Sequence, residues 1–219
     1  MVTTATVSPR HRQISAPVTP VRRVIRAAMA VVFRYHRWWL IERDVSLELP
    51  ETASAGPLEY RVCTAADLPL FRSVRSPWRV WRRIFLDRWH RGQLCIACLD
   101  SSVVAGYVWI ARTPERDRMI GIKIVPGVDE SYGFDLYVKP EYRRRGVAFS
   151  LISLWLRDAR ALGKRRATGI VLDSNTRMLM ATILGFGFRR VRRFASIELL
   201  GRYGVCVHGS WNARQTLGP

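Results

Sequence analysis

Three arginines and a glycine separate a strand-like segment from a helix-like one in Val138-Lys-Pro-Glu-Tyr-Arg-Arg-Arg-Gly-Val-Ala148. The first N–H groups of a helix have no partner within it, and with the helix dipole they attract anions. Gly146 lets the backbone approach an anion closely. A solvated basic loop is the competing interpretation of Arg143, Arg144 and Arg145, but the helix that follows favours a phosphate or pyrophosphate site.

The same residues resemble the acetyl-CoA signature of the GCN5-related N-acetyltransferase (GNAT) family. That signature, Gln/Arg-x-x-Gly-x-Gly/Ala, reads Arg143-Arg-Arg-Gly-Val-Ala148 here. The stretch from Asn175 to Phe188 resembles a later family motif, in which an Asn precedes a helix and a Gly-Phe pair. The resemblance covers roughly residues 58–207. It implies an α/β (α+β) fold with a mixed central sheet flanked by helices and with acetyl-CoA between two central parallel strands.

The resemblance also implies where an acyl-CoA, the co-substrate, is bound. Pantetheine would pair with the backbone near Tyr137 and Val138, and Asn175 would face the second strand of the cleft. The pyrophosphate would lie along the signature, whose members are Arg143, Arg144, Arg145, Gly146, Val147 and Ala148. No metal is expected, because Cys95 and Cys98 point to opposite faces of an apolar strand and have no second pair.

Two departures from the family pattern concern the proton donor. Many members have a Tyr seven residues after the Asn, which protonates the departing thiolate, but Thr182 stands at that position here. The spacing to the final Gly-Phe is one residue longer than usual, because the sequence reads Gly185-Phe-Gly-Phe188. Thr182 is therefore the residue to examine as a donor, with water as the alternative, since a thiol of pKa about 8.5 is a fair leaving group.

An amine must lose its proton before it attacks a thioester, which requires a general base or a water relay. Asp135, on the segment entering the cleft, is the candidate base, and a carboxylate paired with an arginine is the alternative. Trp78, Trp81, Phe85 and Trp89 recur at helical spacing, which is typical of a core face. The resemblance implies that this region walls the acceptor pocket, which makes Trp78 and Trp81 candidate substrate contacts.

The composition favours an anionic partner. The 219 residues include 36 Lys and Arg against 17 Asp and Glu, for a net charge of +19. Nucleic acid, an anionic membrane and a phosphorylated small molecule all fit such a charge. No apolar run approaches the roughly 20 residues of a membrane-spanning helix. The four cysteines do not indicate a disulfide framework.

The N-terminal region differs from the rest of the chain. Residues 1–20 are predicted to be a disordered leader, and residues 21–49 a basic helical extension. Stepped at 100° per residue, 21–41 place Val, Ile, Ala, Tyr and Trp on one face and five arginines on the other. Such a helix would lie on an anionic membrane, or would pack on its own domain or on a second subunit. Deleting residues 1–45 is then expected to leave a folded domain.

The remaining pattern alternates strands and helices. After a linker at 50–57, the acyltransferase domain is predicted over 58–207, with a tail at 208–219. Strands are expected near 58–63, 93–99, 103–111, 119–125, 133–138, 169–172, 188–191, 196–200 and 203–207. Helices are expected near 65–74, 78–91, 149–162 and 178–184.

The sequence thus predicts a cytoplasmic acetyl-CoA-dependent N-acetyltransferase, soluble or at a membrane surface. It would act on a primary amine of a small molecule, acidic or lipid-linked, by direct attack on the thioester. Two alternatives stay open: a toxin that acetylates charged tRNA, and an inactive protein that binds acyl-CoA or associates with membranes. A homodimer is compatible with each.

Overall fold

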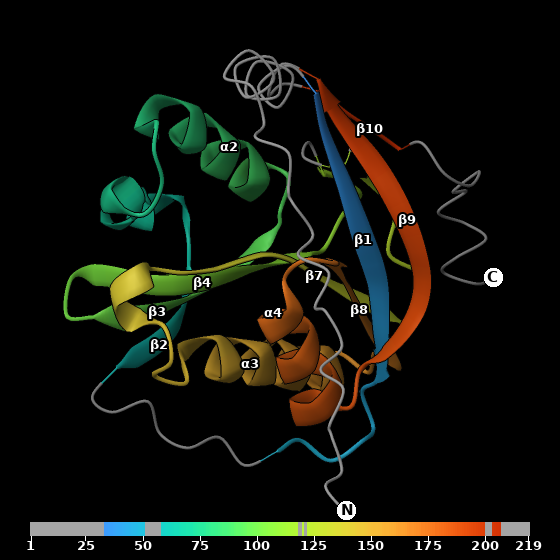
Figure 1. Ribbon diagram of the computed structural model, residues 1–219. Coiled ribbons are helices and arrows are strands. Elements are labelled where there is room, and N and C mark those ends of the chain that lie inside the picture. The colour runs from blue at the N-terminus through green and yellow to red at the C-terminus, as the bar shows by residue number, and fades with distance from the viewer. Residues whose placement is uncertain (1–32, 51–57, 118–119, 121, 200–202, 207–219) are drawn as a thin grey trace, which may run out of the picture.

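An eight-stranded sheet organises the described residues, in the order β10-β9-β1-β8-β7-β4-β3-β2 (Figure 1). This computed structural model describes residues 33–50, 58–117, 120, 122–199 and 203–206. Within the sheet only β7 and β8 pair in parallel. Its strands are β1 Phe33–Asp44, β2 Glu59–Cys63, β3 Leu94–Asp100, β4 Val103–Ala111, β7 Glu130–Val138, β8 Arg166–Leu172, β9 Arg189–Leu199 and β10 Tyr203–Cys206. The remaining two strands, β5 Glu115–Asp117 and β6 Ile122–Ile124, pair with each other in a separate small sheet.

Helices cover both faces of the sheet, as Figure 1 shows. One face carries the 3-10 stretch η1 (Ala65–Ser73) and α2 (Trp78–His90), with Phe71 and Phe85 fully buried. The other face carries α3 (Val147–Ala161) and α4 (Thr176–Met180), which bury Leu151 and Leu179. Each helix contributes its apolar side to one of two separate cores. The fold class predicted from the sequence is confirmed.

The prediction of a basic helix over 21–41 is wrong where the structure describes that segment. Phe33–Asp44 is a strand in the middle of the sheet, antiparallel to β8 on one side and β9 on the other. Trp38 and Ile41 are buried on opposite faces. The division of the chain at residue 49 therefore cuts through the domain, and a membrane-bound helix has no support from these residues. The predicted leader (1–20), residues 21–32 and the tail (208–219) lie outside the described residues.

Most other elements lie close to their expected positions. The helix near 65–74 is 3-10, and the two strands expected over 188–191 and 196–200 form one strand, β9. The short strand β5 was not expected. No helix of the described residues is both long and apolar enough to cross a membrane.

The parallel strands β7 and β8 separate after four paired positions. Pairing runs from Glu130 opposite Arg166 to Gly133 opposite Gly169, and beyond these positions β7 and β8 no longer pair with each other. The Trp155 ring of α3 lies at this fork, so close that a Cβ on Gly133 would approach it to 2.7 Å. The Trp155 indole N–H donates to Ser131 Oγ at 2.9 Å. The missing side chain of Gly133 thus admits the indole that supports the fork.

A buried carboxyl, Glu130, joins the two strands at the start of their pairing. Thr168 Oγ1 donates to Glu130 Oε1 at 2.7 Å, and the Gly127 N–H donates to Oε2 at 3.1 Å. Burial raises the pKa of Glu130 above its ordinary 4.5. A carboxyl with a raised folded-state pKa stabilises the fold below its unfolded pKa, and this contribution is lost as the pH rises through the folded pKa.

We therefore expect Glu130→Gln to become progressively more stable relative to wild type as the pH rises from about 4.5 towards neutrality. The side-chain oxygen of Gln can still accept from Thr168. Thermal unfolding of both proteins across this pH range measures the difference in Tm. A difference that does not change with pH would contradict the expected titration of Glu130.

Candidate functional site

The gap between β7 and β8 is bounded by a bulge in β7. Asp135 has φ 47°, in the left-handed region that a non-glycine residue rarely adopts. The register between β4 and β7 shifts at the same place, between Tyr107 and Trp109. A bulge bends its strand and redirects side chains. The bulge therefore turns β7 away from β8 immediately after the last paired position.

Beyond the bulge, the backbone of Val138 lies on the edge of β7 that faces the gap. The Lys139 N–H donates to Ala105 O on β4 at 2.9 Å. Successive peptide groups of a strand point to opposite edges, so the N–H and C=O of Val138 point away from β4. Arg143 Nε donates to that C=O at 3.2 Å, which leaves the Val138 N–H as the open group. The backbone of Tyr137 faces β4, so Val138 is the better placed of the two predicted pantetheine contacts.

The predicted anion loop has the geometry that such a site requires. Gly146 is the N-cap of α3 with φ 78°, a left-handed conformation that glycine adopts without strain. The first intrahelical bond joins the Ser150 N–H to Gly146 O at 2.9 Å. The N–H groups of Val147, Ala148 and Phe149 precede that bond, and no acidic residue lies in the first turn. These three donors are directed out of the helix start.

The three arginines before the helix are exposed. Arg144 has φ 64°, a backbone conformation that is strained for any residue except glycine. The Arg145 guanidinium lies 5.5 Å from the centre of the Tyr142 ring. Tyr142 in turn donates from its hydroxyl to Asp100 at 2.9 Å, which ties the loop to the end of β3. The loop is therefore anchored, while its guanidinium groups stay accessible to an anion.

Asn175 and Thr182 lie on the segment after β8, with different consequences for their predicted roles. Asn175 Oδ1 accepts from the Met178 N–H at 3.3 Å and caps α4. Thr182 is buried, and its hydroxyl is directed at the carbonyls of Met178 and Leu179, 2.9 and 3.0 Å away. Because this hydroxyl is bound within its own helix, the geometry does not favour Thr182 as a proton donor.

The longer spacing before the final Gly-Phe has a structural explanation. Residues Ala181–Gly185 form a π-helical turn directly after α4. A π-helical turn accommodates one more residue than an α-helical one. The additional residue noted in the sequence is therefore absorbed in the helix, and Phe186 and Phe188 both reach the core.

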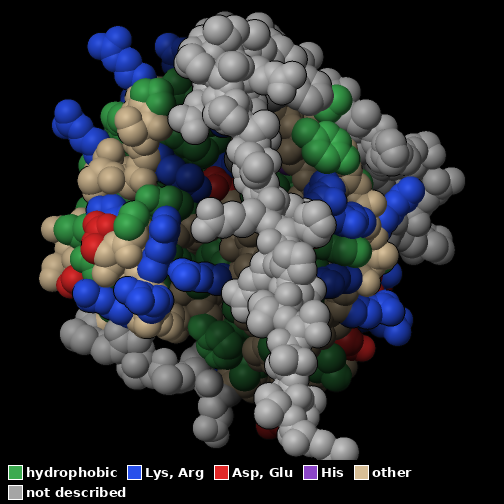
Figure 2. Space-filling model, viewed as in Figure 1, with side chains coloured by type: hydrophobic (Ala, Val, Ile, Leu, Met, Phe, Trp, Pro, Cys, Tyr) green, Lys and Arg blue, Asp and Glu red, His purple; other side chains and the backbone are tan. Residues whose placement is uncertain are grey.

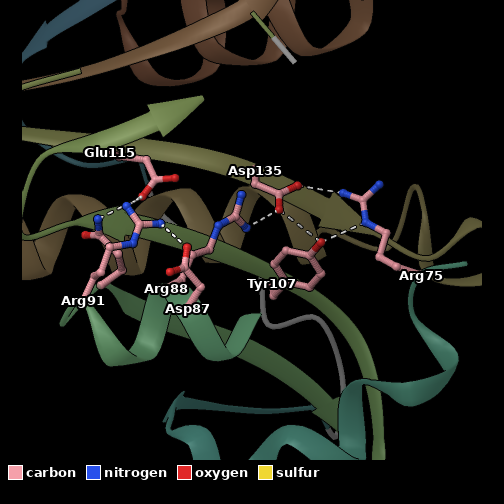
Figure 3. A network of polar contacts seen from close by, with 8 residues as sticks. Arg75, Asp87, Arg88, Arg91, Tyr107, Glu115 and Asp135 are labelled. Atoms are coloured by element: carbon pink, nitrogen blue, oxygen red, sulfur yellow. Dashed lines mark hydrogen bonds and ion pairs between the residues drawn. The ribbon is translucent and has the colours of Figure 1, made fainter. Parts of the chain in front are cut away.

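Asp135 is held by two guanidinium groups (Figure 3). Arg75 Nη2 donates to one carboxylate oxygen at 2.7 Å, and Arg88 Nη1 donates to the other at 2.5 Å. The Tyr107 hydroxyl lies 3.5 Å from the second oxygen. This is the paired carboxylate that the sequence left open as the alternative. The geometry favours a positioning role for Asp135, and its role as general base stays a prediction.

The predicted aromatic wall is present in part. Phe85 is fully buried, whereas Trp78 and Trp81 are half-buried at the start of α2. Trp81 lies 4.7 Å from the Arg75 guanidinium, which also covers the Tyr137 ring at 4.0 Å. Trp81 is thus joined to the bulge through Arg75. Trp78 packs against Phe85 and has no such link.

Sequence reasoning missed Arg75, Arg88 and Tyr107. Arg75 lies in the link between η1 and α2, Arg88 on α2 and Tyr107 on β4, and Arg75 and Asp135 are 60 positions apart. No local spacing joins them, so the pattern offered no signal beyond the general excess of arginine. The predicted placement of Cys95 and Cys98 on opposite faces of a strand is confirmed, because they are buried in different cores. No cluster of metal-ligating side chains occurs among the described residues.

Comparison with known protein families identifies the family to which this fold belongs. A model of the acetyltransferase (GNAT) family matches residues 63–186, more than half of the chain. The chain belongs to the GNAT family. The matched region of this GNAT chain runs from the end of β2 through the π-helical turn and leaves out β1, β9 and β10. No curated protein matches the chain.

Solved structures share the fold at low sequence identity. A putative GNAT acetyltransferase from Novosphingobium aromaticivorans has TM-score 0.52 and 15% identity, covering 76% of this chain and 65% of its own. A GCN5-related N-acetyltransferase from Sphaerobacter thermophilus has TM-score 0.52 and 14% identity, covering 84% and 58%. A functionally unknown protein from Staphylococcus epidermidis has TM-score 0.54 and 10% identity, covering 87% and 69%. The chain spans less than two thirds of the first two, and these likenesses show the fold alone.

Proposed function

We propose that the protein is an acetyl-CoA-dependent N-acetyltransferase that transfers an acetyl group to a primary amine by direct attack on the thioester. The observation that carries this proposal is the gap between β7 and β8, with the open Val138 N–H on its edge and the three N–H groups of α3 at its end. Family membership supports acyl transfer in general.

The residues present fit acetyl-CoA as the co-substrate. The N–H groups of Val147, Ala148 and Phe149 would hold the pyrophosphate, and the exposed guanidinium groups of Arg143–Arg145 would neutralise it. Gly106 supports this arrangement because its missing side chain lets Val147 pack on β4: a Cβ there would lie 3.0 Å from Val147 Cγ1. The start of α3 is thereby fixed against β4, the neighbour of the strand β7 that borders the gap.

The protein would act mainly by positioning. Binding in the gap would bring the thioester carbon within reach of an amine that enters from the side of α2, which converts a bimolecular step into a local one. A backbone N–H on the edge of β7 would polarise the thioester carbonyl as negative charge develops on its oxygen. Water would protonate the departing thiolate, because the Thr182 hydroxyl is bound within its own helix.

A coupled assay tests this function. The protein is incubated with acetyl-CoA and a panel of primary amines, and coenzyme A release is measured together with the acetylated amine by mass spectrometry. We expect both products in equal amounts. Acetyl-CoA binding without transfer to any amine would instead support the inactive binding protein, and absence of binding would overturn the acetyl-CoA assignment altogether.

Asp135→Asn separates the two roles of this carboxylate. We expect kcat/KM to fall about 10²-fold, because Arg75 and Arg88 lose the anion that orients them, with acetyl-CoA affinity unchanged. The shape of the pH profile should be retained. Asp87→Asn is the matched control, since Asp87 is an exposed carboxylate on α2 that pairs with Arg91. Loss of the acidic limb of the profile would identify Asp135 as the general base, and near wild-type turnover would leave it without a role in the reaction.

A further inference from the structure

Arg75 is held in one position but keeps one side of its guanidinium open. Its Nε donates to the Tyr107 hydroxyl at 2.8 Å and its Nη2 donates to Asp135 at 2.7 Å. The guanidinium lies 4.0 Å from the centre of the Tyr137 ring. Nη1 has no hydrogen-bond partner among the described residues, and the side chain is 25% exposed. A rigid guanidinium with two free N–H donors is suited to binding an anion.

The surroundings of Arg75 carry excess positive charge. Arg88 shares Asp135 with it, and Lys139, which is 8% exposed, donates to Ser73 Oγ at 3.0 Å. Within the described part of the chain, Asp135 is the only carboxylate within 4 Å of these three cations. Burial raises the pKa of Tyr107, so that its hydroxyl stays neutral. Arg75 and Arg88 share a single carboxylate, and this surplus of positive charge, largely shielded from water, favours the arrival of a further anion.

This excess charge is distinct from the anion loop. Tyr137 and Tyr107 pack in the core beneath η1 and α2, whereas Val138 and Val147 pack in the core beneath α3. Arg75 and the loop therefore lie on opposite faces of the sheet. In Figure 3 Arg75 and Arg88 approach Asp135 from two sides at the bulge. The pyrophosphate that the loop would hold cannot also neutralise Arg75, so an anion that pairs with Arg75 would have to come from the other substrate.

We propose that Arg75 determines acceptor specificity by pairing with an anionic group, a carboxylate or a phosphate, on a small amine substrate. This inference rests on the proposed acetyl transfer. Nη1 would donate to the anionic group, while Trp81 and Tyr137 would flank the carbon chain between that group and the amine. Asp135 would hold Arg75 in place and keep the amine end of the substrate close to the thioester.

Matched pairs of amines test the proposal with the wild-type protein. Phenylalanine is compared with phenylalaninamide, and phosphoethanolamine with ethanolamine, each at saturating acetyl-CoA. We expect kcat/KM, expressed per concentration of deprotonated amine, to favour the anionic member of at least one pair by about tenfold or more, the factor of one charge-assisted hydrogen bond. The pair that shows the preference distinguishes carboxylate from phosphate. Equal or better use of the neutral members, or no reaction of either anionic amine while a neutral one reacts, would overturn the proposal and leave acetyl transfer intact.

Arg75→Gln locates the effect. We expect the ratio of kcat/KM for the preferred anionic amine to kcat/KM for its neutral partner to fall at least about tenfold, with the Kd of acetyl-CoA unchanged. Arg72→Gln is the matched control, because it removes the same charge from an exposed position of η1. Equal loss with both members of a pair would show a structural role and overturn the proposal. If the Arg75→Gln protein is not folded, as judged by the absence of a cooperative unfolding transition, Arg75→Lys and the comparison of amine pairs with the wild-type protein test the proposal instead. If no amine releases coenzyme A, the proposed function itself fails.

The surface around the site agrees with attraction of anionic substrates. Figure 2 shows lysine and arginine side chains on both sides of the face seen in Figure 1, with few acidic ones among the described residues. A net charge of +19 raises the local concentration of anions and their rate of association. The preference for the anionic amine at Arg75 should persist when salt screens this long-range attraction, since a short, shielded contact is screened much less.

Discussion

Gly146→Glu is expected to abolish acetyl-CoA binding while the fold survives. The substitution places a carboxylate where the pyrophosphate would meet the N–H groups of Val147 and Ala148. It also puts a side chain on a residue with φ 78°, which costs roughly 1–2 kcal/mol of stability. That loss is small beside the 5–15 kcal/mol typical of a folded domain. Isothermal titration calorimetry with acetyl-CoA, together with thermal unfolding, measures both effects.

Gly163→Glu provides the control at the other end of the same helix. Gly163 follows α3 with φ 67°, and no atom lies within 4 Å of the Cβ it would gain. The two substitutions therefore carry similar backbone strain and the same charge. We expect Gly163→Glu to bind acetyl-CoA with wild-type affinity. A folded Gly146→Glu protein that also binds with unchanged affinity would remove the anion loop from the site.

Interruption of β1 is expected to unfold the protein. Leu40 is 3% exposed and lies opposite Ile170 of β8 and Arg192 of β9, so a proline there removes a backbone donor between two neighbouring strands. We expect Leu40→Pro to lose at least about 3 kcal/mol of unfolding free energy, because it removes a buried leucine side chain and leaves a buried carbonyl oxygen without its donor. Deletion of residues 1–45 should prevent folding, because it also removes Trp38 and Ile41 from both cores. Chemical denaturation monitored by circular dichroism tests the first variant, and soluble expression the second.

Leu40→Ile is the control for position 40, since a change of shape without loss of volume costs less than about 1.5 kcal/mol. A truncated chain that unfolds cooperatively and binds acetyl-CoA would show that β1 is dispensable. That result would restore the interpretation of the N-terminal region as an appendage.

The sequence predicted β1 as a helix for a physical reason. A strand with partners on both sides and a core on each face does not alternate between apolar and polar residues. Trp38 to Ile41 are four consecutive apolar residues, and with the aromatics before them they also fill one face when read at helical spacing. The position of β1 between β8 and β9 depends on contacts across more than 120 residues. Local periodicity contains no information on such contacts.

The same distinction explains which parts of the site could be predicted. The loop from Arg143 to Ala148 is a local structure: its charge, its glycine and the helix after it are consecutive in the chain. The cluster around Asp135 is not local in sequence. Asp135 lies on β7, whereas Arg75 and Arg88 come from the helical layer that covers this face of the sheet. The fork at Gly133 likewise depends on Trp155, which arrives on another element. The sequence could therefore indicate where the pyrophosphate would be held, but not what surrounds the acceptor.

Hydrogen–deuterium exchange with and without acetyl-CoA tests most directly that the gap between β7 and β8 is the binding site. The amides of Val147, Ala148 and Phe149 precede the first bond of α3, and the Val138 amide faces the gap. We expect acetyl-CoA to slow exchange in the segments 134–138 and 146–149. Protection confined to other segments, such as β2 and β3, or no protection at saturating acetyl-CoA, would contradict this placement.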